Sequence, residues 1–181
     1  MTERHARIDG ALVMIGFGSI GRGTLPLIER HIDFDRSRFT VIEPSADHAH
    51  ILRDHGIHHL QLALTPDNLA EVLRGLFPGG RGMIVNLSVD VDSVEVMKLA
   101  QEMGVLYIDS VVEPWPGFYF GSPLPNADRT NYPLRERVRA LGKSYAGGPT
   151  AVSCCGANPG MVSWLLKEAL LRLAADTGVK A

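Results

Sequence analysis

The sequence predicts an α/β fold in which a doubly wound parallel sheet carries helices on both faces. Short apolar runs alternate with longer segments of helical periodicity along the first 145 residues. The apolar runs are nearly continuous, as expected for strands that are covered on both faces. Glycine or proline stands at several junctions, where it favours the beginning or end of a helix. Repeated strand–helix units of this kind favour a parallel sheet.

Composition sets the broad class of protein. The chain has 181 residues, of which 45% are hydrophobic and 21% charged, the balance of a soluble globular protein. A formal net charge of −2 argues against a strongly electrostatic nucleic-acid binder or a membrane-surface module. The apolar run near the start, residues 11–15, is too short to span a bilayer. With only two cysteines and no disulfide framework, we expect the protein to be cytoplasmic.

The first predicted strand, residues 11–15, leads into a glycine-rich turn and then a helix that runs to His31. Gly16, Gly18 and Gly21 have G-x-G-x-x-G spacing, in which the first glycine permits a tight turn. The second lets the backbone approach a pyrophosphate, and the third lets the helix pack closely on the strand. Free N–H groups at the helix start would face the phosphates. The pattern predicts a Rossmann-type dinucleotide site.

The second predicted strand, residues 38–44, carries an acid near its end. Glu43 lies about 20 residues beyond Gly21, where this fold places the carboxylate that binds the adenosine ribose. A carboxylate there would repel the 2′-phosphate of NADP. The predicted cofactor is therefore NAD.

The alternation continues up to the middle of the chain. Thr65 is predicted as the N-cap of a helix, with Pro66 at its first position, and Gly56 and Gly104 are predicted to end helices. The expected elements are a helix over 47–56, a strand over 57–64, a helix over 65–76, a strand over 81–89, a helix over 90–104 and a strand over 105–113.

The last part of the chain predicts a loop over 121–133, a helix over 134–144, a strand within 147–160 and a final helix over 161–178. Asn158 is placed to cap this helix and Gly178 to end it. The helix is apolar almost all round, so it requires burial on more than one side. We expect a Rossmann domain over 1–145, followed over 146–181 by the beginning of a catalytic and dimerisation domain. The chain is then a fragment, or it has an obligate partner.

Ligands of such sheets bind beyond the carboxyl ends of the strands. Asn86 and Ser88 end one predicted strand, where they would meet the nicotinamide ribose or carboxamide, and Asp109 ends the next. Glu113 and Trp115 follow in the turn "EPWPG", stiffened by its prolines. A carboxylate beside an aromatic face suits an ammonium group, through charge pairing and cation–π attraction.

Two other groups of residues favour plainer interpretations. Seven histidines occur, but those at 48, 50, 55, 58 and 59 do not have the spacing of convergent metal ligands, so we expect solvated side chains and no metal site. The adjacent Cys154 and Cys155 are expected to be two small buried hydrophobes.

The chain resembles the bacterial homospermidine synthases, within the saccharopine dehydrogenase-like group. The resemblance runs from about residue 12 to residue 178 and is carried by "VMIGFGSIGRGTLPLIERH", "DSVVEPWPGFYF", "NYPLRERV" and "GGPTAVSCCGANPGMVSW". It implies an enzyme that joins two putrescines into homospermidine with loss of ammonia and uses a recycled NAD. Members of this family are much longer, so the resemblance implies that further catalytic and dimer-forming parts lie beyond residue 181 and that the whole protein is a homodimer.

Site residues follow from the turns and the resemblance together. The expected catalytic residues are Glu113, Asn158, Trp115 and Asp90. The expected cofactor-binding residues are Gly16, Gly18, Ser19, Ile20, Gly21, Glu43, Asn86, Leu87, Ser88, Asp109, Cys154, Gly156 and Asn158. Two other functions stay open: a related NAD(P)-dependent imine reductase of the saccharopine or carboxynorspermidine dehydrogenase kind, and a regulatory domain that senses NAD without chemistry.

Overall fold

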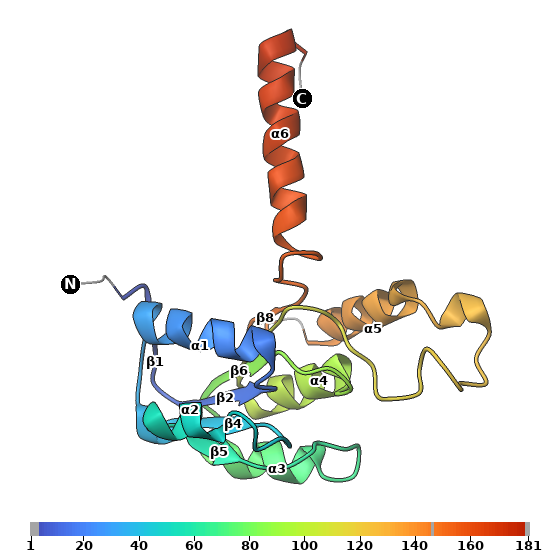
Figure 1. Ribbon diagram of the computed structural model, residues 1–181. Coiled ribbons are helices and arrows are strands. Elements are labelled where there is room, and N and C mark those ends of the chain that lie inside the picture. The colour runs from blue at the N-terminus through green and yellow to red at the C-terminus, as the bar shows by residue number, and fades with distance from the viewer. Residues whose placement is uncertain (1–3, 146, 180–181) are drawn as a thin grey trace.

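The computed structural model describes residues 4–145 and 147–179, and its centre is a parallel sheet of six strands. The strand order is β5-β4-β2-β6-β7-β8, and each neighbouring pair is parallel. The predicted doubly wound α/β fold is therefore confirmed (Figure 1). The strands are β2 (Ala11–Ile15), β4 (Phe39–Ile42), β5 (His58–Leu60), β6 (Gly82–Asn86), β7 (Leu106–Asp109) and β8 (Ala151–Val152).

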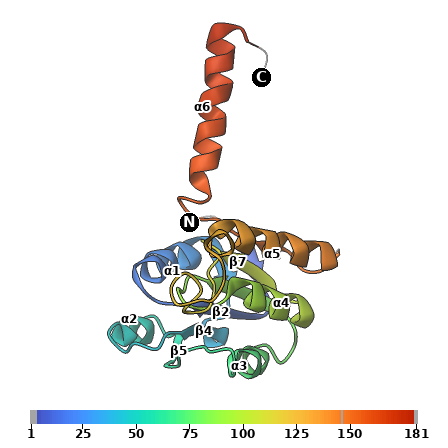
Figure 2. The same ribbon diagram turned by 90° about the vertical axis from the view of Figure 1, so that its right-hand side faces the viewer.

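Helices cover both faces of the sheet and bury two separate apolar clusters. One cluster joins Leu12 of β2 to Leu25 and Leu52, and the other joins Val13 of β2 to Leu73 and Met97. Neighbouring residues of β2 thus point into opposite layers, as the strand period of two requires. Figure 2 shows α1 and α2 on one side of the sheet and α4 and α5 on the other. The helices are α1 (Ser19–His31), α2 (Ala49–Asp54), α3 (Leu69–Leu76), α4 (Ser93–Met103), α5 (Asn131–Ser144) and α6 (Met161–Thr177), with short 3₁₀ turns η1 (Arg36–Arg38) and η2 (Asn126–Asp128).

A second, two-stranded sheet was not predicted from the sequence. β1 (Ala6–Ile8) pairs in parallel with β3 (Ile32–Phe34). In the sequence, β1 precedes β2, and β3 directly follows α1. Both strands have three residues and neither is fully buried, so they lack the apolar pattern that marks the central strands.

Helix ends show where the sequence signals held. Gly104 and Gly178 stand at the C-caps of α4 and α6 in the left-handed conformation, which confirms both predictions. The predicted caps at Thr65 and Asn158 are wrong. α3 begins at Leu69 after a turn, with Asn68 in the N-cap position, and α6 begins at Met161 with Gly160 in that position.

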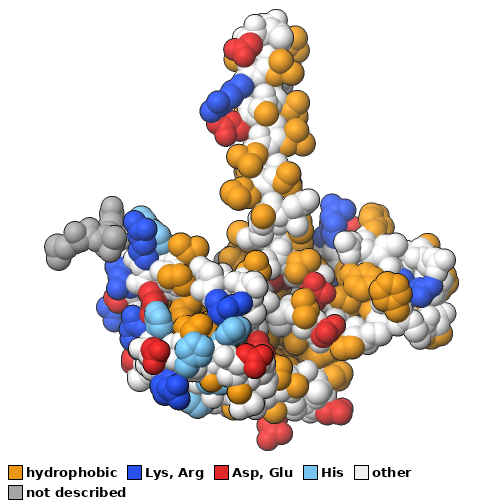
Figure 3. Space-filling view, viewed as in Figure 1, with side chains coloured by type: hydrophobic (Ala, Val, Ile, Leu, Met, Phe, Trp, Pro, Cys, Tyr) orange, Lys and Arg blue, Asp and Glu red, His pale blue; other side chains and the backbone are white. Residues whose placement is uncertain are grey.

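α6 stands away from the sheet as an extended arm (Figure 1). Its apolar side chains are exposed, including Trp164 at 71% and Leu166 at 61%. Apolar groups appear along this arm in Figure 3. The boundary predicted at residues 145–146 stays a prediction. Across residues 4–145 and 147–179, no helix is both long and apolar enough to cross a membrane.

Candidate functional site

An open groove of about 570 Å³ lies at the carboxyl edge of the sheet. It sits where the strand order reverses, because β2 leads to β4 on one side and pairs with β6 on the other. At such a reversal the two connections that leave the neighbouring strands run in opposite directions, which leaves a crevice at the carboxyl ends of the strands. Topology therefore places the groove, and the residues in the turns decide what it binds.

The glycine-rich turn forms one wall of the groove, and its three glycines differ in what surrounds them. Gly16 has φ +90°, and a Cβ there would lie 2.8 Å from the backbone of Ser88. At Gly21 a Cβ would lie 2.5 Å from the carbonyl oxygen of Gly16. At Gly18 no heavy atom lies within 4 Å of a Cβ position, so the backbone faces open space. The first and third glycines permit tight packing, and the second leaves room for a ligand to approach.

Glu43 follows β4 and points toward the glycine-rich turn. Its Oε2 accepts a hydrogen bond from the Phe17 amide at 2.8 Å, and its Oε1 accepts one from the Ser45 amide at 2.9 Å. The His59 Nε2 lies 2.8 Å from the Glu43 carbonyl oxygen. The carboxylate is fixed by backbone groups, and an ionised carboxylate with two partners still has lone pairs for further donors.

The groove brings together many of the residues predicted from the sequence. The strand predicted over 57–64 contains β5, but the apolar residues that follow β5 were not predicted to belong to the site. The predicted lining residues are Gly16, Gly18, Ser19, Ile20, Glu43, Leu87, Ser88 and Asp90, and those missed include Pro44, Leu62, Ala63, Leu64, Val89, Val91 and Pro116.

Asn86 and Asp109 do not line the groove, although both were predicted to bind the cofactor. Asn86 is 3% exposed and Asp109 is 1% exposed. The Asn86 Nδ2 donates to the Tyr107 hydroxyl at 3.2 Å, and that hydroxyl donates to Asp109 Oδ2 at 2.9 Å. Burial raises the pKa of the Asp109 carboxyl, with donors from Cys154, Tyr107 and Ser153 opposing that shift. Both polar side chains therefore face protein groups.

Beyond β7, Glu113 is held at the start of α4 through its backbone. The Ser93 amide donates to the Glu113 carbonyl at 2.8 Å, and the Glu113 amide donates to Ser93 Oγ at 2.9 Å. Among the described residues, the carboxylates of Glu113 and Asp90 have neither a hydrogen bond nor an ion pair. Burial raises the pKa of the Glu113 carboxyl, and the charges of Asp90 and Asp109 add to that rise.

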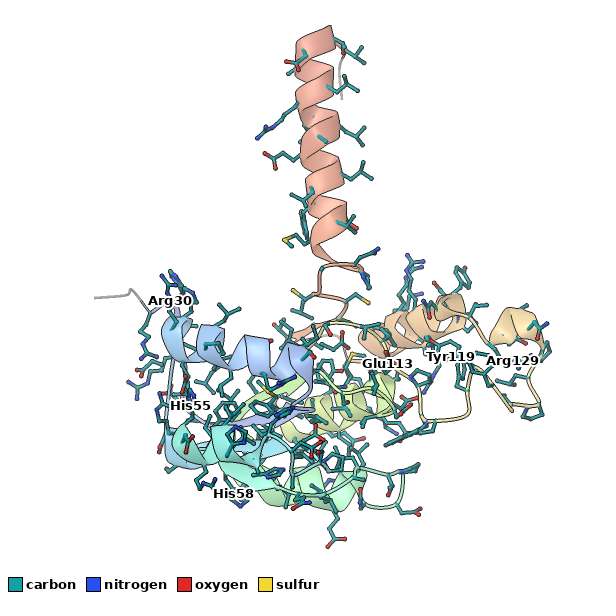
Figure 4. All side chains as sticks on the ribbon, in the orientation of Figure 1. Arg30, His55, His58, Glu113, Tyr119 and Arg129 are labelled. Atoms are coloured by element: carbon teal, nitrogen blue, oxygen red, sulfur yellow. The ribbon has the colours of Figure 1, made fainter. Side chains whose placement is uncertain are left out.

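Tyr119 lies further along the same loop, which Figure 4 shows leading outward from Glu113. Its hydroxyl donates to Asn131 Oδ1 at 2.8 Å. Burial raises the pKa of the Tyr119 hydroxyl, and the negative charge of Glu113 raises it further. Arg129 donates to the Tyr119 carbonyl at 3.1 Å further along this loop, but in the described residues no cation pairs with the carboxylates of Glu113 or Asp90. Unpaired carboxylates of this kind suit a positively charged ligand.

The remaining predicted residues lie around this region in different environments. Trp115 packs partly buried against the cluster that holds α3 and α4, and its Nε1 is buried without a hydrogen-bond partner in the described residues. Asn158 is exposed. Cys154 and Gly156 belong to the turn after β8; Cys154 is half-buried and Cys155 exposed, so the expectation of two buried thiols is wrong. Across residues 4–145 and 147–179, no group of three or more His, Cys, Asp or Glu could hold a metal ion.

Comparison with known proteins identifies relatives over nearly the whole chain. The chain is 58% identical over 177 residues to the homospermidine synthase of Blastochloris viridis and 54% identical over 178 residues to that of Mesorhizobium japonicum. Each match covers 97% of this chain and 37% of the relative. The chain therefore spans little more than a third of the length of these curated relatives.

A solved structure matches the same region. The crystal structure of the homospermidine synthase from Legionella pneumophila in complex with NAD is similar with a TM-score of 0.84 and 30% sequence identity, over 98% of this chain and 36% of that one. The family described as the saccharopine dehydrogenase NADP binding domain matches residues 12–152. That range contains the six strands of the sheet apart from the first residue of β2, so the chain belongs to the family of saccharopine dehydrogenase NADP binding domains.

Proposed function

We propose that this chain is the cofactor-binding part of a homospermidine synthase, which condenses two putrescines into homospermidine with release of ammonia. One observation carries the proposal beyond the similarity to such enzymes. The carboxyl edge of a single sheet holds a carboxylate fixed by backbone amides, Glu43, and a half-buried carboxylate without a partner in the described chain, Glu113. The first suits a ribose and the second suits an ammonium group.

The groove residues fit NAD. Open space beside Gly18 leaves room for a pyrophosphate, and Gly18 is the N-cap of α1, the end at which a helix has free N–H groups. Glu43 lines the groove where the adenosine ribose would lie. Its carboxylate can accept hydrogen bonds from ribose hydroxyls but would repel a 2′-phosphate, which supports NAD rather than NADP despite the description of the family.

The residues after β7 fit the amine substrate. Putrescine carries two positive charges at neutral pH, so a site for it requires negative charge at each end. Glu113 and the more exposed Asp90 supply two carboxylates, and burial and the charge of Asp90 both raise the pKa of the Glu113 carboxyl. A raised pKa also makes Glu113 a better acceptor for the proton that an alkylammonium must lose before its carbon can be oxidised.

Bound NAD would supply a hydride acceptor that is regenerated within one cycle. Glu113 would hold the reacting nitrogen and stabilise the positive charge that develops when the amine becomes an imine. Two putrescines give one homospermidine and one ammonia, so the overall reaction needs no net oxidant. We propose that the side chain of Asn158 and the face of Trp115 also contact the substrate in the intact protein.

A test uses the intact protein, putrescine and a small amount of NAD. We expect homospermidine, identified by mass, in large molar excess over NAD, with no accumulation of NADH. Net use of cofactor in proportion to product would support an imine reductase instead. NAD binding without any product from putrescine would support a domain that senses the cofactor.

Cytoplasmic location and a homodimer belong to the same proposal. The two free cysteines are compatible with a reducing compartment. Light scattering of the intact protein measures the assembly, and a mass of one subunit would contradict the dimer.

A further inference from the structure

A chain of hydrogen bonds runs across the ends of β6, β7 and β8. Ser88 Oγ donates to Asn86 Oδ1 at 2.6 Å, and Asn86 Nδ2 donates to the Tyr107 hydroxyl at 3.2 Å. That hydroxyl donates to Asp109 Oδ2 at 2.9 Å. From the other side, Ser153 Oγ donates to Asp109 Oδ1 at 2.9 Å. The chain therefore begins at the groove wall and ends in the turn after β8.

Asp109 is the point at which the two sides meet. The Cys154 amide donates to its Oδ1 at 2.7 Å, and the Cys155 amide donates to its carbonyl oxygen at 3.0 Å. Tyr107, Ser153 and Cys154 each supply a donor, so both carboxylate oxygens are occupied by protein groups. At 1% exposure, the side chain has no open surface for a ligand.

The turn after β8 has few other attachments to the sheet. β8 pairs with β7 only at Ala151 and Val152. Cys154 has φ +61°, a left-handed conformation that is unusual for a side chain with a Cβ and needs support from its surroundings. A Cβ on Gly156 would lie 2.9 Å from the Ser110 carbonyl oxygen, so the turn also packs closely on the end of β7.

We propose that Asp109 is a positioning residue, whose buried carboxylate holds the turn over Ser153–Gly156 against the end of β7 and links it through Tyr107 and Asn86 to Ser88. Under the proposed function, on which this inference rests, that turn leads to Asn158 and forms the edge of the substrate side. Asp109 thus acts on the reaction through the Cys154 amide and through Tyr107, in place of the direct cofactor contact expected from the sequence. Within the described residues, Asp109 has no hydrogen bond to the glycine-rich turn or to Glu43, so we expect NAD affinity to depend on it only weakly.

The first test compares two buried carboxylates in the intact protein. Asp109→Asn keeps the size but places an NH₂ group among donors. Asp92→Asn is the control, because Asp92 is likewise buried, at 3% exposure, and accepts hydrogen bonds from Val94, Glu95 and Arg137. Asp92 caps α4, and asparagine is also a good helix cap, so this substitution should be tolerated. We expect Asp109→Asn to lower kcat by about 10- to 100-fold, since misplacement by about 1 Å can cost that much. NAD affinity should change by less than about threefold, and Asp92→Asn should keep kcat within about threefold.

A second measurement does not depend on catalysis. In a Cys155→Ser background, the rate at which a small alkylating reagent modifies Cys154 reports whether the half-buried turn stays in place. Asp109→Asn should raise that rate by about tenfold or more, because local release exposes the thiol. Tyr107→Phe keeps the hydrogen bonds that Ser153 and Cys154 donate to Asp109, so it should raise the alkylation rate less than Asp109→Asn does.

The outcomes separate this inference from the proposed function. Faster alkylation in Asp109→Asn supports the positioning role even if the parent protein forms no homospermidine. An unchanged alkylation rate overturns it. A loss of NAD affinity as large as the loss of kcat also overturns it, because Asp109 would then support the cofactor site itself. An equal loss of kcat in Asp92→Asn points to general destabilisation and has the same consequence.

Discussion

Two glutamates at the same edge of the sheet differ in what surrounds their carboxylates. Glu43 accepts hydrogen bonds from the amides of Phe17 and Ser45, one at each carboxylate oxygen. Glu113 is fixed only through its backbone, by Ser93, and within residues 4–145 and 147–179 its carboxylate has no partner. Burial and neighbouring negative charge raise the pKa of Glu113.

The difference indicates two kinds of ligand. A carboxylate already held by amides keeps its position when neutral hydroxyls bind. Glu43 therefore suits hydroxyl donors at fixed positions, and its negative charge is already partly satisfied by the two amides. A half-buried carboxylate beside other carboxylates is unfavourable as long as it stays unpaired, and a cation relieves that cost. The Glu43 carboxylate thus has its partners within this chain, and the unpaired Glu113 carboxylate suits a positively charged ligand.

The largest expected effect comes from removing the charge of Glu113. In the intact protein, Glu113→Gln should lower kcat for homospermidine formation by about 10²-fold or more, as loss of a preorganised electrostatic contact does. NAD affinity should stay nearly unchanged. Turnover close to that of the parent at saturating putrescine would mean that the turn over residues 113–117 is only a rigid loop.

A smaller effect is expected on the nucleotide side. Glu43→Ala should weaken NAD binding by about 1.5–3 kcal/mol, the range for hydrogen bonds to a charged group. Direct titration of NAD measures this change. Glu43→Gln, which keeps one acceptor oxygen, is the matched control and should lose less. If Glu43→Ala binds NAD as well as the parent, the ribose assignment is wrong.

The pH dependence of the reaction tests the neighbours of Glu113. Only the ionised carboxylate pairs with an ammonium group, so kcat/KM should fall as pH falls through the raised pKa of Glu113. This fall should occur at higher pH than an ordinary glutamate would give. Asp90→Asn removes one negative charge and should move the fall toward lower pH. If kcat/KM falls over the same pH range in Asp90→Asn as in the parent, the charge of Asp90 does not raise the pKa of Glu113.

The smallest effect is expected at Trp115. Its ring packs against the core, and its Nε1 has no partner in the described chain, so much of its role is packing. Trp115→Phe should keep part of both the packing and the cation–π attraction, and it should lower kcat/KM by less than about tenfold. A loss as large as that of Glu113→Gln would place the indole in contact with the reacting amine.

Much of the glycine-rich turn could be predicted from the sequence because its spacing is a local pattern. Gly21 is required by a contact with Gly16 inside the turn, and Glu43 follows the next strand of the sheet, but the close approach of Ser88 to Gly16 comes from a distant part of the chain. The role of Asp109 could not be predicted in this way. Its burial is set by Ser153 and Cys154, more than forty residues later, and nothing in the spacing shows that their donors close over it.

The helix caps give the same lesson on a smaller scale. Gly104 and Gly178 are in the left-handed conformation that favours glycine, and a pattern search finds them. Thr65 and Asn158 have the right residue types for N-caps, but α3 and α6 begin further along the chain. Residue type alone does not place the first residue of a helix, because Gly160 is the N-cap of α6 and Asn68, the N-cap of α3, makes no side-chain capping hydrogen bond.

The most direct test of the two separate carboxylates is a double variant of the intact protein. Glu43→Ala and Glu113→Gln are combined, and NAD affinity and kcat at saturating NAD and putrescine are measured for the parent, both single variants and the double variant. If the two sides act separately, the double variant has the weakened NAD affinity of Glu43→Ala and the lowered kcat of Glu113→Gln, each unchanged by the other substitution. If both single variants change the same quantity, or the double variant is no worse than one of them, the two glutamates serve one step and the account is contradicted.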